Sequence, residues 1–275
     1  MEITWLGTAG FRIRSGGASI LIDPYLTRNP GAIPHQPLTP EDLGPADAIL
    51  VSHGHFDHIM DVPAIARHTG ARVFCSTTAA RTLKGTRTLK GTRIFGVRGL
   101  AKDRLAKDQI GIIEKDRTTL HIKEIRATAF FSRHVRFDTR LLATTLARVT
   151  PGIGRILPLV LGFPCGQVLS WRLRAENKTL HFFGSAGSGK AELHALAASP
   201  PDILLVPLQG HSDICDLAFR YVEILRPETV IPHHQDDFYP PLSQTVDIQP
   251  FVGRVSTCFP RTRVRVMGIN DTLLF

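Results

Sequence analysis

The sequence predicts an α/β protein with mixed sheets, built as a single domain over residues 1–275. Strand-like and helix-like segments alternate along the chain without a long polar linker between them. The second half repeats a strand–helix pattern, which is typical of parallel strands in one sheet. Several strand-like segments are also followed at once by histidine, aspartate or serine, as expected where binding groups gather at one sheet edge.

The composition places limits on the class of protein. A chain of 275 residues buries enough surface for a stable core without disulfides or a structural metal. Its cysteines are Cys75, Cys165, Cys215 and Cys258, and their wide spacing argues against a zinc ribbon or a disulfide scaffold. No uninterrupted apolar run reaches about 18 residues, and the chain starts as a strand rather than as a signal peptide. We therefore expect a cytoplasmic protein without a transmembrane segment.

Residues 1–24 are expected to form two strands around the turn Arg14-Ser15-Gly16-Gly17. Asp23 closes the second strand, directly before Pro24. The region 25–45 is rich in proline and glycine, so we expect an irregular loop there.

The densest group of polar side chains follows in the motif Ser52-His53-Gly54-His55-Phe56-Asp57-His58. The apolar run 46–51 before it predicts a buried strand, and a helix is expected at about 61–68 with Asp61 as its N-cap. The motif is therefore expected to lie in a strand-to-helix turn, where a rigid scaffold can direct its side chains.

The residue types of this motif point to metal binding. Neutral imidazole and carboxylate suit a divalent ion such as zinc. Asp57 and His58 are adjacent and point differently from His53 and His55, so one segment can serve two neighbouring ions.

A basic segment occupies residues 81–107, where the hexad Arg81–Thr86 is repeated at once as 87–92. Two interpretations are open: a solvated loop, or a patch that attracts phosphate groups. The segment lacks the interleaved aromatic residues that single-strand binders use to stack bases.

Further strands are expected at 72–75, 109–114, 119–125 and 127–134. The last of them ends in His134. Residues 135–166 then break the pattern, with apolar residues on a helical spacing beside arginines. This stretch is interpreted either as core packing or as a lid or insert for a substrate with apolar and anionic parts. An interfacial amphipathic helix would look similar.

The second half is regular. Strands are expected at 179–183, 202–207 and 229–232, with helices at 190–198 and 214–226. The βαβαβ order places Ser185, His211 and His234 at the same strand ends, and hence at one edge of the sheet.

The motif His53-x-His55-x-Asp57-His58 and the first hairpin, with its Ile22-Asp23-Pro24 turn, resemble the metallo-β-lactamase superfamily. The resemblance covers most of the chain. It is nearest to the branch containing ascorbate-6-phosphate lactonase and N-acyl-phosphatidylethanolamine phospholipase D type enzymes. It implies a four-layer αββα sandwich with mixed sheets.

The resemblance also implies a set of metal ligands. The first ion would take His53, His55 and His134. The second ion would take Asp57, His58 and His234. The implied ions are two divalent metals, zinc first, with manganese or iron as alternatives.

One position departs from the family pattern. Most members place a bridging aspartate after a glycine, where this chain has Gly184-Ser185. With fewer negative charges facing two cations, the second site is expected to be weaker. Asp213, Asp236 and His211 are candidates to substitute for the missing carboxylate.

The implied activity is metal-dependent hydrolysis. A metal-bound hydroxide would attack an ester, lactone or phosphodiester in a phosphorylated or lipid-like anionic substrate. Asp57 and His211 are the candidate catalytic residues. Asp23 and Ser185 are candidates to orient a ligand or to contact substrate. The alternatives are a nucleic-acid-processing hydrolase of the same superfamily and a non-catalytic metal-binding or scaffold protein; peripheral membrane contact is also open.

Overall fold

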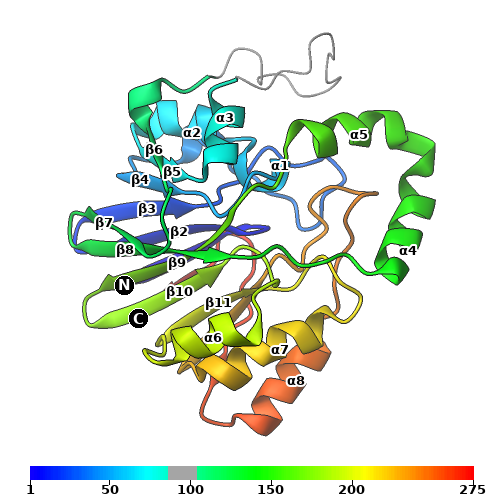
Figure 1. The fold of residues 1–275 in the computed structure, drawn as a ribbon. Coiled ribbons are helices and arrows are strands. Elements are labelled where there is room, and N and C mark those ends of the chain that lie inside the picture. Colours follow the sequence, from blue (N-terminus) through cyan, green and yellow to red (C-terminus); the bar gives the residue numbers. More distant parts are fainter. Residues whose placement is uncertain (86–103) are drawn as a thin grey trace.

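The computed structural model describes residues 1–85 and 104–275, and it has four layers (Figure 1). Two seven-stranded sheets pack face to face, and helices cover the outer face of each. The predicted αββα sandwich with mixed sheets is therefore confirmed. The second copy of the basic hexad and residues up to 103 lie outside the described residues.

The first sheet has the order β14-β1-β2-β3-β4-β5-β6. Its strands in chain order are β1 Glu2–Gly7, β2 Gly10–Ser15, β3 Ala18–Ile22, β4 Ala48–Leu50, β5 Arg72–Cys75, β6 Ile110–Ile112 and β14 Thr272–Leu274. The prediction of two strands before residue 24 is wrong, because a tight turn at Thr8 and Ala9 splits the first one. Gly7 and Thr8 adopt positive φ values of 91° and 52°, and the Trp5 indole N–H donates to the Thr8 carbonyl. A left-handed threonine is uncommon, so the local sequence gave little sign of this turn.

The second sheet has the order β13-β12-β11-β10-β9-β8-β7. Its strands are β7 Thr118–Ile122, β8 Ile125–Ser132, β9 Val168–Ala175, β10 Lys178–Phe183, β11 Ile203–Pro207, β12 Thr229–His233 and β13 Arg263–Val264. Strands β10, β11 and β12 are parallel, as the βαβαβ pattern predicted. His134 lies two residues beyond the end of β8, in the loop that follows the strand.

Helices cover both sheets. The first sheet is covered by α1 Phe56–Ile59, α2 Val62–Thr69 and α3 Thr77–Leu83, and the second by α6 Lys190–Ala197, α7 Ile214–Leu225 and α8 Gln249–Cys258. Short 3-10 helices occur at η1 Pro40–Asp42, η2 Lys107–Gln109 and η3 Thr150–Gly152. Between the sheets, Trp5, Phe11, Trp171 and Phe182 belong to one buried core. This core fixes the two sheets against each other and so aligns their strand ends.

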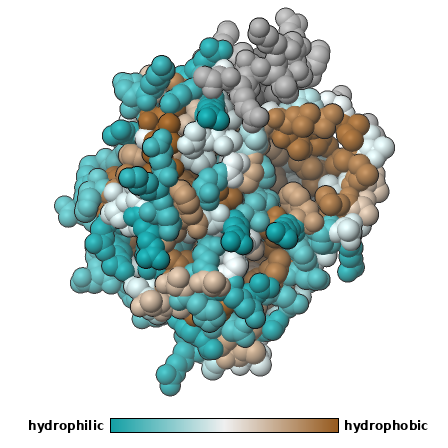
Figure 2. Space-filling model, in the orientation of Figure 1, coloured by the Kyte–Doolittle hydropathy of each residue, from teal (hydrophilic) through white to brown (hydrophobic). Residues whose placement is uncertain are grey.

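A helical arm, residues 135–164, leaves the sandwich between β8 and β9. It carries α4 Thr139–Val149 and α5 Ile153–Gly162, which stand beside the sheets in Figure 1. Apolar side chains gather on its surface (Figure 2), and the large exposed ones are Phe137, Leu142, Leu146, Ile153, Leu157, Val160 and Leu161. Leu159 and Phe163 of the arm are instead buried against the helices of the first sheet. The arm is thus partly packed, as the core interpretation expects, and partly exposed, as the lid interpretation expects.

Among the described residues, no helix combines the length and the apolar character that a membrane span requires.

Candidate active site

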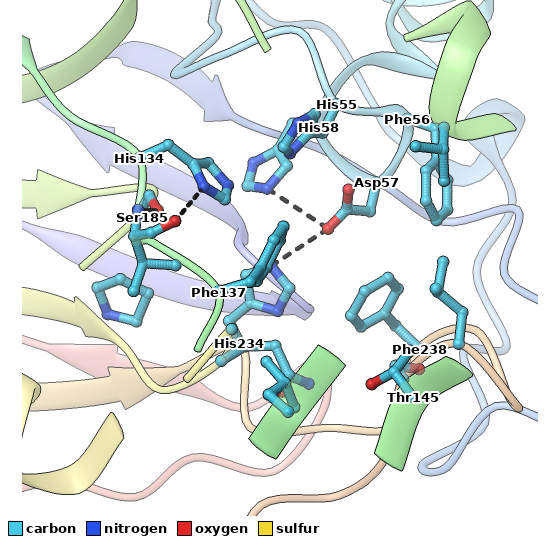
Figure 3. Close-up of a pocket in the computed structure, with 18 of the residues that line it drawn as sticks. His55, Phe56, Asp57, His58, His134, Phe137, Thr145, Ser185, His234 and Phe238 are labelled. Atoms are coloured by element: carbon cyan, nitrogen blue, oxygen red, sulfur yellow. Dashed lines mark hydrogen bonds and ion pairs between the residues drawn. The ribbon is translucent and has the colours of Figure 1, made fainter. Parts of the chain in front are cut away.

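Loops after strands of both sheets meet at one edge of the sandwich. The motif follows β4, His134 follows β8, Ser185 follows β10 and His234 follows β12. Figure 3 shows side chains from all four loops lining one pocket. The βαβαβ order predicted that Ser185, His211 and His234 share this edge; Ser185 and His234 line the pocket, and His211 is not among the lining residues.

The first group of side chains contains His53, His55, His134 and Cys165. One ligand atom from each lies within 4.8 Å of the others. Nε2 of His53 is 3.1 Å from Nδ1 of His55. Two nitrogen ligands on one tetrahedral ion lie about 3.3 Å apart, given metal–nitrogen bonds of about 2.0–2.1 Å. The donors of this group therefore fit a divalent ion such as zinc.

The second group contains Asp57, His58 and His234, all buried. Oδ2 of Asp57 is 3.4 Å from Nε2 of His58 and 3.2 Å from Nε2 of His234 (Figure 3). Nδ1 of His234 is buried and has no hydrogen-bond partner in the described part of the chain. A carboxylate between two imidazole nitrogens is also a donor set that suits zinc.

Hydrogen bonds behind these side chains fix their ring orientations. Nδ1 of His58 donates to Oδ2 of Asp23 at 2.7 Å, and Nδ1 of His134 donates to the Val135 carbonyl at 2.7 Å. Each bond leaves the Nε2 atom of its histidine as the acceptor that faces the site. Asp23 also accepts the backbone N–H of Ser52 at 2.7 Å. Partners of this kind select the tautomer of a metal-binding histidine, which is the role expected for Asp23.

Burial and charge set the protonation of the first group. Burial lowers the pKa of His53 well below its ordinary value, and the nearby His58 acts in the same direction. Burial lowers the pKa of His55 to about 4 against an opposing effect of Asp57, and it also lowers the pKa of His134. These imidazoles are therefore neutral near pH 7, as metal ligands must be.

The second group differs because it contains a carboxylate. Burial alone would raise the pKa of Asp57, but His58 and His234 outweigh it and hold the pKa of Asp57 below its ordinary value. Burial lowers the pKa of His58, but Asp57 and Asp23 outweigh it, so the net pKa of His58 is raised.

Ser185 replaces the expected bridging carboxylate, and its hydroxyl oxygen accepts a hydrogen bond from the backbone. Its Oγ accepts the N–H of Val135 at 2.9 Å. The flanking glycines allow close packing: a Cβ on Gly184 would lie 2.1 Å from Oγ of Ser52, and one on Gly187 would lie 2.2 Å from the His134 carbonyl oxygen. Ser185 thus holds the loop that carries His134.

Cys165 was missed as a site residue, because the cysteines were judged only by their spacing along the chain. Its backbone carbonyl accepts the N–H of Gly54 at 2.8 Å. A Cβ on Gly54 would lie 2.2 Å from the Pro164 carbonyl oxygen. The available signal was Gly54 between the two motif histidines, because a glycine there allows another segment of backbone to approach closely. Burial raises the pKa of the Cys165 thiol to about 11, and Asp57 acts in the same direction.

His211, by contrast, is not among the residues that line the pocket. Its Nδ1 accepts the N–H of Asp213 at 3.0 Å and lies 3.5 Å from Oδ2 of Asp138, the N-cap of α4. Asp213 is exposed, and Asp236 forms a buried ion pair with Arg28. In the described chain, none of the three candidate substitutes for the bridging carboxylate belongs to either ligand group.

Asp61 occupies the predicted N-cap position of α2, but its side chain acts elsewhere. The Asp61 side chain makes no cap hydrogen bond to α2. Its Oδ2 accepts the N–H groups of Leu26 and Thr27, both at 2.6 Å. Asp61 therefore anchors the loop after β3, the predicted irregular loop of residues 25–45.

Both ligand groups border a cavity of about 420 Å³. The opposite wall is largely apolar and is made mainly by the arm and by residues near 240 (Figure 3). The apolar lining includes Phe137, Leu141, Leu142, Leu159, Val160, Phe163, Phe238 and Leu242. Arg148 of α4 also lines the cavity. Its Nη1 donates to Gln244 and its Nη2 to Thr145, whereas its buried Nε has no partner within the described residues.

Comparison with known proteins identifies the family. Residues 2–234 match the model of the beta-lactamase superfamily domain. A "UPF0173 metal-dependent hydrolase" of Carboxydothermus hydrogenoformans is 31% identical over 236 residues, which cover 85% of this chain and 84% of the relative. A second protein of that name, from Myxococcus xanthus, is 29% identical over 90% of this chain and 74% of the relative.

Solved structures share the fold. The metallo hydrolase Igni18 of Ignicoccus hospitalis superposes with a TM-score of 0.67 at 20% identity, over 100% of this chain and 97% of its own. A likeness at this identity shows the fold alone. With the matching family model and the relative from Carboxydothermus, the chain belongs to the UPF0173 metal-dependent hydrolases of the metallo-β-lactamase superfamily.

Proposed function

We propose that this hydrolase cleaves an ester, lactone or phosphodiester whose substrate has an apolar body and an anionic group. One observation carries the proposal: both ligand groups border a single cavity whose opposite wall is the largely apolar arm. Ligand sites that are mostly apolar with a few placed polar groups are typical of small-molecule binding. The resemblance to the lactonase and phospholipase D type branch supports a lipid-like or phosphorylated substrate.

Two divalent ions would be held by the two groups. His53, His55 and His134 would bind the first ion, and Asp57, His58 and His234 the second. When bound, such ions lower the pKa of a coordinated water and polarise the attacked oxygen. The chain itself contributes the orientation of the ligands, through Asp23 for His58 and the Val135 carbonyl for His134.

Of the two candidate catalytic residues, Asp57 keeps only its other expected role, as a metal ligand, and His211 takes a different role in this proposal. The lowered pKa of Asp57 keeps it ionised, which suits a metal ligand better than a proton acceptor. We assign His211 to positioning the arm, because it lies beside Asp138 at the start of α4 and outside the cavity lining.

Arg148 is the candidate contact for the anionic part of the substrate. It lines the cavity from the arm, and among the described residues its Nε has no hydrogen-bond partner. A carboxylate or phosphate beside this guanidinium would gain a charge-assisted hydrogen bond. The ligand groups and Arg148 would thus bind opposite parts of one substrate, with the apolar wall between them.

A set of chromogenic substrates tests the proposal. Nitrophenyl esters with short and long acyl chains, each with and without a terminal carboxylate, would be compared with a nitrophenyl phosphodiester. We expect faster turnover of the long-chain compounds, and the double variant His53→Ala/His55→Ala should lose both bound metal and turnover. Turnover that survives in this variant would contradict the proposal.

A second variant tests the anion contact. In Arg148→Gln, KM should rise about tenfold for the carboxylate-bearing ester, because a hydrogen bond to a charged group is lost. The KM for the neutral ester of the same length serves as the control and should change little. An equal rise for both esters would contradict an anion contact at Arg148.

A further inference from the structure

The first ligand group contains a fourth donor that the three-histidine pattern does not require. The sulfur of Cys165 lies with the ring nitrogens of His53, His55 and His134, all within 4.8 Å of one another. The family resemblance supplies three ligands for this ion and a bridging carboxylate, whose position here is Ser185. The hydroxyl of Ser185 accepts a hydrogen bond from Val135, and Ser185 is not part of the ligand group.

The backbone around Cys165 is held firmly against the motif. Gly54 donates to the Cys165 carbonyl at 2.8 Å, and Leu169 donates to the Ser52 carbonyl at 2.7 Å. On the other side, Gly166 has a positive φ of 68° and packs against Thr78, where an added Cβ would lie 2.3 Å from the Thr78 Cβ. The residues that carry His53 and His55 therefore also position Cys165.

We propose that Cys165 is the fourth protein ligand of the first metal ion, which it binds as a thiolate. This inference rests on the proposed metal centre and goes beyond it by assigning the ligand, the charge and the role of one ion. Asp57 provides one negative charge for two dications, and the thiolate would provide a second. Thiolate and imidazole together favour zinc over magnesium or manganese.

The proposal also divides the roles of the two ions. Four protein ligands are typical of a closed zinc site, whereas a catalytic ion keeps a position open for water or substrate. The histidines of both groups line the cavity, whereas Cys165 is not among the lining residues. With Cys165 bound, the first ion would have four protein ligands and would be the more firmly held, and the second, with three, would keep a position for water or substrate.

Cobalt(II) titration of the metal-free protein tests this directly. A thiolate bound to cobalt gives a sulfur-to-metal charge-transfer band in the near ultraviolet, while visible bands report cobalt in either group. We expect the near-ultraviolet band to be complete after about one equivalent, while the visible bands continue to grow with the second.

Variants distinguish the loss of the Cys165 ligand from the loss of the whole metal site. Cys165→Ser should lose the near-ultraviolet band, keep visible bands and bind the first ion at least about tenfold more weakly. Cys258→Ser, at an exposed cysteine, is the matched control and should behave as wild type. Cys165→Asp should restore much of the affinity without the sulfur band, which excludes misfolding as the cause of the loss.

Three outcomes would overturn the proposal. Visible bands that weaken in His53→Ala but come with no sulfur band in wild type would leave the metal centre standing and remove Cys165 from it. A sulfur band that persists in Cys165→Ser would also remove Cys165 from the centre. If no variant, wild type included, gave cobalt bands, the proposed metal centre itself would be wrong.

Discussion

Asp23 accepts a hydrogen bond from Nδ1 of His58 at 2.7 Å, across 35 residues of sequence and within a fully buried pair. The same carboxylate holds both the backbone N–H and the hydroxyl of Ser52. One side chain at the end of β3 thus orients a proposed ligand and fixes the turn that carries the motif.

Replacing Asp23 should therefore weaken the second ion more than the first. In Asp23→Asn we expect affinity for the second ion to fall about 10- to 100-fold, the usual effect of losing a partner behind a metal ligand. Metal titration followed by calorimetry would measure both steps. Unchanged binding of both ions would show that Asp23 does not act through His58.

A buried ion pair beside His234 is expected to contribute strongly to stability. Arg28 pairs with Asp236, and both side chains are almost fully buried. The Asp236 carboxylate also accepts the N–H of Thr8 at 2.9 Å, while the N–H of His234 donates to the Thr8 carbonyl at 2.9 Å. This network links the β1–β2 turn to His234, the last of the proposed ligands along the chain.

Asp236→Ala should lower the free energy of unfolding of the metal-free protein by about 3–5 kcal/mol, because it leaves the Arg28 charge buried and unpaired. Urea unfolding monitored by circular dichroism measures the change. The double variant Arg28→Met/Asp236→Leu removes both charges and should recover much of the loss. A single and a double variant of equal stability would argue against the unpaired charge as the cause.

The arm offers a matched pair for testing the apolar wall. Leu142 and Leu146 are both exposed on α4, at 52% and 57%, but only Leu142 lines the cavity. Leu142→Asp should reduce kcat/KM for a long-chain ester at least about tenfold, since a charge would face the apolar part of the substrate. Leu146→Asp introduces the same charge one helical turn away and should have little effect. Equal losses in the two variants would place the substrate elsewhere.

The two ligand groups should lose their ions at different pH. The raised pKa of His58 lets it take up a proton at higher pH than an ordinary histidine, so protons begin to compete with the second ion above the usual histidine range. The lowered pKa values of the first group, about 4 at His55, postpone this competition. Metal content after equilibration at stepwise lower pH should fall in two stages, the second ion first. Simultaneous loss would contradict this order.

Much of this site could be predicted because its residues follow a simple rule. The motif, His134 and His234 begin within two residues of strand ends, which the hydrophobic pattern marks, and the family resemblance singled out His134 and His234 as ligands. Parallel β10, β11 and β12 then bring their ends to one edge, as expected for any chain with that order.

The features that the sequence missed depend on contacts between distant segments. Cys165 joins the first group because Gly54 allows the backbone at 164–165 to approach, and neither residue signals the other along the chain. Asp61 precedes a helix as an N-cap would, yet the N–H groups of Leu26 and Thr27 attract its carboxylate instead. The arm could not be classified because some of its apolar residues pack inward while others stay exposed.

The arm has one further consequence, which follows from where it begins and ends. His134 stands directly before it and Cys165 directly after it, so a single ion that binds both would close residues 135–164 into a loop. Loading the first ion and ordering the substrate wall would then be thermodynamically linked, because closing a loop removes entropy from its open ensemble. Such a protein would assemble its specificity pocket only when its metal is in place, and the metal-free form would show this as faster proteolysis within the arm.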